Sequence, residues 1–199
     1  MTNSEYTHLH VVVDRSASMH ADNKYVALSE EMTNLIKEQI DLPGKFTYSI
    51  TEFNQEISHP VVFTEIFVPY TLVPRGNTAL LDAVGGDVAS LGERLSKMPE
   101  ENRPGLVIFM IVTDGEENAS KEYTIDQVRE MIQHQQEVYG WDFMFLGAEE
   151  AAWAGRDMGI MNVSSFTNDS HGTRAVYGAS LTYITDKRTT GEASLPDQV

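Results

Sequence analysis

The fold is decided by the stretch Val11-Val12-Val13-Asp14-Arg15-Ser16-Ala17-Ser18-Met19, where an apolar run ends in an acid followed by alternating hydroxyls. Residues 11–13 show no polar alternation, so they predict a strand buried on both faces, as in the centre of a parallel sheet. Such sheets bind ligands beyond the carboxyl ends of their strands, where Asp14, Ser16 and Ser18 follow. These side chains offer the hard oxygen ligands that Mg2+ or Mn2+ accepts. A turn whose serines only bind backbone amides explains this stretch equally well.

Two further stretches carry matching residue types. Thr78 follows Gly76 and opens a run with helical apolar spacing, and Thr113-Asp114-Gly115 ends the apolar run of residues 106–112. With Asp14-x-Ser16-x-Ser18, these pieces resemble the von Willebrand factor A (VWA, integrin I-like) domain. The metal-ion-dependent adhesion site (MIDAS) of that family combines Asp-x-Ser-x-Ser, a Thr, and a Thr-Asp-Gly after the fourth strand. The three pieces stand here in the same order, and the resemblance covers residues 8–188.

The resemblance implies a set of metal ligands. Ser16, Ser18 and Thr78 would bind Mg2+ (or Mn2+) directly, and Asp14 and Asp114 would bind it directly or through water. If the two aspartates act through water, the ion keeps no anionic protein ligand and stays strongly electrophilic, so a carboxylate from a partner can replace a water. The resemblance therefore implies a non-enzymatic, metal-dependent protein-binding (adaptor) module, similar to small stand-alone bacterial or phage VWA proteins.

Several acids follow the predicted strand ends and have two interpretations. Asp82 lies in the first turn of the helix predicted from Thr78, either as a favourable acid at a helix start or as an acceptor for the serine hydroxyls or a metal-bound water. Four glutamates share two interpretations: they are solvated turn residues, or they rim the crevice. These are Glu116, Glu117, Glu149 and Glu150. If they rim it, their charge disfavours an acidic partner, so we expect a basic protein surface that presents one Asp or Glu.

Composition limits the classes of function. The chain has 199 residues, no cysteine and a formal net charge of −16. Without cysteine there is no disulfide framework or thiolate chemistry. The acidic balance disfavours nucleic-acid binding, which needs clustered Lys and Arg. The first residues lack the features of a signal peptide, and the apolar runs are too short to span a membrane. We therefore expect a cytoplasmic protein without nucleic-acid or membrane partners.

Strand and helix patterns alternate along the chain, which predicts a doubly wound α/β fold with helices on both faces of a mostly parallel sheet. The run of residues 57–63 contains Pro60 and is expected to form an antiparallel edge strand. A first helix is expected over residues 22–40, and Trp153 is expected to fill the core. The predicted organisation is an N-terminal extension (1–7), a VWA-like domain (8–188) and a flexible C-terminal tail (189–199).

Two other functions remain open. The chain could be a structural or assembly component whose metal only stabilises the crevice loops. Less favoured is a Mg2+-dependent phosphohydrolase with Asp14 as nucleophile. Phosphatases of the haloacid dehalogenase type carry a second Asp two residues later for proton transfer, and Ser16 stands at that place here.

Overall fold

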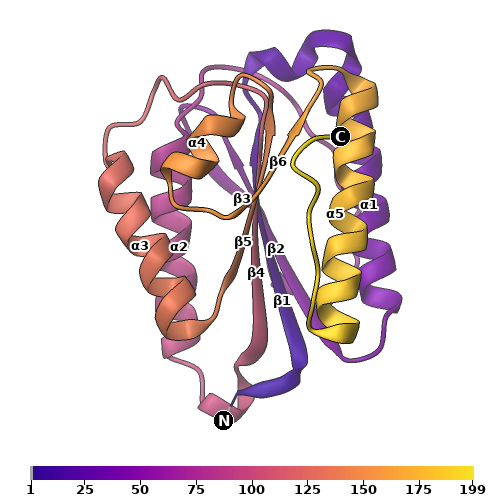
Figure 1. Ribbon diagram of the computed structural model, residues 1–199, viewed down its shortest axis with the longest axis vertical. Coiled ribbons are helices and arrows are strands. Elements are labelled where there is room, and N and C mark those ends of the chain that lie inside the picture. The colour runs from indigo at the N-terminus through magenta and orange to yellow at the C-terminus, as the bar shows by residue number, and fades with distance from the viewer. Residues whose placement is uncertain (1) are drawn as a thin grey trace.

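The computed structural model describes residues 2–199 (Figure 1). This part of the chain forms one six-stranded sheet in the order β3-β2-β1-β4-β5-β6, parallel except for β3. The strands are β1 (Asn3–Asp14), β2 (Lys45–Phe53), β3 (Ile57–Thr64), β4 (Pro104–Thr113), β5 (Asp142–Ala148) and β6 (Asn162–Phe166). The helices are α1 (Lys24–Asp41), α2 (Leu80–Ser96), α3 (Ile125–Tyr139), α4 (Ala152–Asp157) and α5 (Ser170–Thr190), with 3-10 turns η1 (Ala17–Asn23) and η2 (Glu100–Asn102). The predicted doubly wound α/β fold is confirmed.

Helices cover both faces of the sheet, as Figure 1 shows with α1 and α5 on one side and α2 and α3 on the other. Each face of the sheet has its own apolar core, and alternate residues of β1 pack into the two cores. Leu9, Val11 and Val13 face α1 and α5, whereas Val12 faces α2. Both faces of the central strand are thus buried, which explains its unbroken apolar run.

The two outer strands are protected in different ways. β3 pairs with β2 in antiparallel orientation and contains Pro60, as predicted, and its register shifts along the pair. At the other edge, residues near the C-terminus run beside β6. The N–H of Ser165 donates to the carbonyl of Asp197 at 2.8 Å, and the N–H of Val199 donates to the carbonyl of Ser165 at 3.0 Å.

Residues near both ends of the described chain contact the rest of the domain. β1 begins at Asn3, so most of the predicted extension belongs to the sheet. Beyond α5, residues Ala193, Leu195 and Val199 pack against the core on the α5 side. The predicted domain bounds and the predicted flexibility of residues 189–199 stay predictions.

Two local predictions were wrong. The first helix begins at Lys24, because Asp22 and Asn23 adopt left-handed backbone angles (φ 49° and 56°) that interrupt a helix. Trp153 is 49% exposed rather than buried, because it lies on the outer side of the short helix α4, whose neighbours Ala152 and Ala154 face the core.

Two histidines of β1 are buried between the sheet and α2. His8 stacks on Phe63 and its Nδ1 lies 2.9 Å from the hydroxyl of Thr47. His10 pairs with the buried carboxylate of Asp87 at 2.8 Å. Burial, with smaller contributions from His10 and Arg94, holds the pKa of His8 well below its usual value of 6.5.

The His8 environment predicts loss of stability in acid. The unfolded chain protonates this imidazole below about pH 6.5 while the folded protein keeps it neutral, so the free energy of unfolding falls as the pH drops below 6.5, by about 1.4 kcal/mol per unit. Between pH 7.5 and 5.5, urea titrations should show a loss about 1.4 kcal/mol larger in the wild type than in His8→Gln. The exposed His20→Gln serves as control and should follow the wild type; equal losses in all three proteins would contradict the prediction.

Candidate functional site

The carboxyl ends of β1 and β4 lie side by side at the centre of the sheet, where the strand order reverses. Asp14 ends β1 and is fully buried. One of its carboxylate oxygens accepts the N–H of Ser16 at 2.6 Å, and the other accepts the hydroxyl of Thr113 at 2.7 Å. The Asp14 carboxylate therefore joins the serine turn after β1 to the end of β4.

Three hydroxyls and two carboxylates gather above this junction. The Ser16 and Ser18 hydroxyl oxygens are 2.8 Å apart, and Ser18 donates to Oδ1 of Asp114 at 2.6 Å. A Cβ atom added to Gly115 would lie 3.3 Å from Thr78 Oγ1, 3.7 Å from Asp14 Oδ2 and 3.8 Å from Ser18 Oγ. The glycine thus leaves space in a cradle lined by oxygens from two separate segments, the turn after β1 and Thr78, and Asp114 from a third segment joins them through its hydrogen bond with Ser18. The structure brings together all five residues predicted as metal ligands.

Thr78 reaches the cluster through two loop contacts. Gly76 has φ +81°, and a Cβ there would overlap the side chain of Gln55, so this position requires glycine. Asn118 clamps the threonine backbone from the other side, because its side-chain oxygen accepts the Thr78 N–H at 3.1 Å and its own N–H donates to the Thr78 carbonyl at 3.0 Å.

The cluster is buried at its base and open at one point. Ser16 and Thr78 are buried, whereas Ser18 is exposed. Burial raises the pKa of Asp14 to about 6; hydrogen bonds from Thr113 and Ser16 counteract this rise, and the nearby charge of Asp114 adds to it. A positive charge in the cradle would favour the ionised form of this carboxyl group.

Lys24 is a charged residue at the site that sequence reasoning missed. Its side chain is 2% exposed, and its ammonium donates to Oδ2 of Asp114 and to the side-chain oxygen of Asn168. The only sequence signal is a lysine shortly after the Asp-x-Ser-x-Ser stretch, which is normally interpreted as a solvated helix residue.

The three acids named as candidates around the site take different positions. The carboxylate of Asp82 accepts the backbone N–H groups of residues 121–123 at 2.7–2.9 Å. Glu117 accepts the N–H groups of Leu81, Ala119 and Ser120 at 2.7–3.0 Å. Both therefore brace the loop after β4 against the start of α2. The hydroxyls of Ser16 and Ser18 bond to each other and to Asp114 instead. Glu116 is exposed in the same loop.

The donor set fits a hard cation. The five side chains supply oxygen atoms only, and Mg2+ or Mn2+ prefers such ligands. Within residues 2–199 there is no group of three or more His, Cys, Asp and Glu side chains suited to a metal, so a centre here would depend on hydroxyls. Ser16, Ser18 and Thr78 are the residues that provide them.

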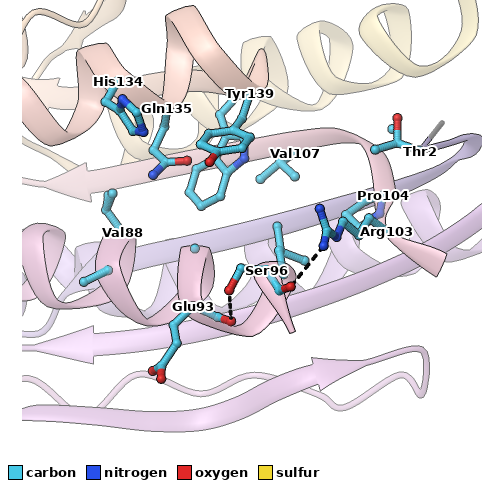
Figure 2. Close-up of a pocket in the computed structure, with 15 residues that line it drawn as sticks. Thr2, Val88, Glu93, Ser96, Arg103, Pro104, Val107, His134, Gln135 and Tyr139 are labelled. Atoms are coloured by element: carbon cyan, nitrogen blue, oxygen red, sulfur yellow. Dashed lines mark hydrogen bonds between the residues drawn. The ribbon is translucent and has the colours of Figure 1, made fainter. Parts of the chain in front are cut away.

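A separate pocket of about 370 Å3 lies at the amino-terminal ends of the strands, between α2 and α3 (Figure 2). Val88, Val107 and Tyr139 form part of its wall, and Arg103 donates to the Ser96 carbonyl at its rim. None of the clustered oxygen ligands lines it. The pocket is therefore distinct from the cluster at the carboxyl ends.

No family model matches the sequence, and no curated protein matches it. Several solved structures are similar to this chain, and VWA domains are among them. The chain therefore has the von Willebrand factor A fold. Within residues 2–199, no helix is both long enough and apolar enough to cross a membrane.

Three of the similar structures illustrate this likeness. The vWF domain of the type V pili tip protein Mfa5 from Porphyromonas gingivalis is 10% identical with a TM-score of 0.68, and the match covers 94% of this chain and 98% of that one. The PilB minor pilin from Streptococcus sanguinis is 12% identical with a TM-score of 0.66, and the match covers 94% of this chain and 63% of that one. Proximal thread matrix protein 1 from the mussel byssus, solved with a zinc-occupied MIDAS motif, is 15% identical with a TM-score of 0.62. That match covers 88% of this chain and 45% of the mussel protein. The match thus spans less than two thirds of the last two proteins.

The bracing role of Asp82 predicts a loss of stability on its removal. Asp82→Ala leaves three backbone N–H groups without their charged acceptor, and we expect the free energy of unfolding to fall by about 1.5–3 kcal/mol in urea titrations. Amide exchange of residues 121–123 should accelerate as well. The exposed Asp186→Ala removes the same charge and should change stability by about 0.5 kcal/mol or less. Similar losses in both variants would argue against the bracing role.

Proposed function

We propose that the chain is a protein-binding module whose affinity depends on a divalent cation held at the MIDAS-like cluster. Ser16, Ser18 and Thr78 would hold Mg2+ or Mn2+ through their hydroxyls, with Asp14 and Asp114 as carboxylate ligands, directly or through water. The bound ion supplies a positive charge that attracts a carboxylate from a partner. The observation that carries this proposal is the convergence of these five side chains around the cradle at Gly115.

The exposure pattern supports binding rather than catalysis. Both carboxylate oxygens of Asp14 accept hydrogen bonds, and the residue is fully buried, which does not suit a nucleophile that must reach a phosphoester. Ser18, in contrast, is exposed beside Asp114 and can face a partner. We therefore retain the non-enzymatic interpretation.

Charge supports one type of partner surface. The chain carries a formal net charge of −16, and Glu116, Glu149 and Glu150 are exposed in loops that follow β4 and β5. A generally acidic partner would be repelled. A basic protein surface with a single Asp or Glu at its centre combines long-range attraction with a ligand for the ion.

The similar structures agree with an interaction role at a coarser level. Their names include a pilus tip protein, a minor pilin and a thread matrix protein, and one MIDAS motif among them holds zinc. A structure of this fold thus holds a divalent cation, and Mg2+ or Mn2+ is our proposal for this chain. The cytoplasmic location inferred from composition stays a prediction.

The metal-binding step is tested by calorimetric titration with Mn2+ and Mg2+. Ser18→Ala and Thr78→Ala should each weaken binding at least about tenfold, because each removes one proposed ligand. The exposed Ser96→Ala makes the same chemical change on α2, away from the cluster, and should bind as the wild type does. Equal affinity in all four proteins would refute the ligand assignment.

The partner-binding step needs a separate experiment. Affinity capture with Mg2+ and with chelator, using Asp14→Ala as control, should recover a partner only from the wild type with Mg2+. If metal raises the melting temperature but capture is unaffected by metal, the ion has a purely stabilising role and the protein-binding proposal fails.

A further inference from the structure

Lys24 places a buried ammonium group against the oxygen cluster. It is the first residue of α1, and its Nζ donates to Asp114 and to Asn168, which lies between β6 and α5. Lysine is almost never buried to this extent without a charged partner, since removing the ammonium from water is costly. The contact with Asp114 supplies that partner.

The ammonium uses only one side of the Asp114 carboxylate. Oδ2 accepts Lys24, while Oδ1 accepts the hydroxyl of Ser18. The lysine and the serine hydroxyls therefore act on the same carboxylate at the same time, from opposite oxygens. Lys24 does not displace the hydroxyls from the cradle.

The lysine changes the charge of the site. Asp14 and Asp114 are the two carboxylates of the cluster, and Lys24 is the cation in direct contact with one of them. Two carboxylates and one ammonium leave a single net negative charge. With a divalent cation added, the site would carry one net positive charge, whereas without the lysine it would be neutral.

We infer that Lys24 is a fixed counter-charge that weakens metal binding and, in return, strengthens the attraction of the bound metal for a carboxylate. This inference rests on the proposed function. The ammonium repels an incoming cation and shares the Asp114 charge that would otherwise neutralise it. A metal bound beside Lys24 therefore keeps more of its positive charge for the carboxylate of the partner.

The surrounding backbone holds Lys24 in this position. Asp22 and Asn23 both have left-handed backbone angles, and α1 begins immediately after them. Asn168 holds the ammonium from a second loop. Lys24 is therefore a positioning residue that acts through Asp114, and we expect its effect to be electrostatic.

The test measures two affinities that should change in opposite directions. Mn2+ binding is measured by calorimetry, and acetate binding to the Mn2+-loaded protein by the fall in water-proton relaxation as acetate replaces bound water. Lys24→Met removes the charge at similar size, and Lys24→Gln also retains a hydrogen-bond donor. The exposed Lys37→Met on α1 makes the same charge change away from the site.

We expect both Lys24 variants to bind Mn2+ about ten- to a thousand-fold more tightly, the range by which one adjacent charge alters the proton affinity of a carboxylate. Both should bind acetate at least about threefold more weakly, and Lys37→Met should match the wild type. Weaker binding of both Mn2+ and acetate would show a merely structural role for Lys24. Unchanged Mn2+ affinity would also overturn the inference.

The outcomes separate this inference from the proposed function. If the wild type binds neither Mn2+ nor Mg2+, the proposed function fails; if it binds them and the Lys24 variants bind no more tightly, only the inference fails. Should neither variant fold, 15N NMR of the wild-type lysine ammonium groups decides the question. The Lys24 signal must then shift on Mg2+ addition, and a signal that stays in place overturns the inference.

Discussion

The buried carboxylate of Asp14 is the constraint on which the site depends. Burial makes its charge expensive, and two hydrogen bonds, from the Ser16 N–H and the Thr113 hydroxyl, offset that cost. The same bonds fix the turn after β1 against the end of β4. Because these strands are neighbours at the point where the sheet order reverses, Asp14 positions the serine turn beside the end of β4, whereas Thr78 is held there by its own contacts with Asn118.

The fold was predictable because its strongest signals are local. Apolar runs without alternation identified β1 and β4, and Pro60 identified the edge strand β3. The failures have tertiary causes. The start of β1 at Asn3 depends on pairing with β4 rather than on apolar pattern, and Asp22 and Asn23 accept left-handed angles that a helical pattern does not reveal.

The meeting of the serine turn with Asp114 was predictable, because parallel strands bring their carboxyl ends to one edge, whereas Thr78 entered the ligand set through the resemblance to the VWA family. Individual side-chain roles were less accessible. Asp82 and Glu117 bind backbone groups of the β4–α3 loop, and no spacing rule distinguishes this from a contact with the serines. Lys24 escaped notice because Asp114 and Asn168 are 90 and 144 residues away in the chain, so only the folded structure brings them together.

The segment beside β6 has a consequence for the behaviour of the protein in concentrated solution. The outward-facing N–H and carbonyl of Ser165 both form hydrogen bonds with this segment, to Asp197 and from Val199. They are therefore not available for pairing with another chain. An uncovered strand edge acts as a template for another chain, which leads to intermolecular sheet growth. Residues 197–199 thus cover this edge of the sheet at Ser165. Shortening the chain there, or attaching a fusion that pulls these residues away, would favour self-association even though the oxygen cluster stays intact.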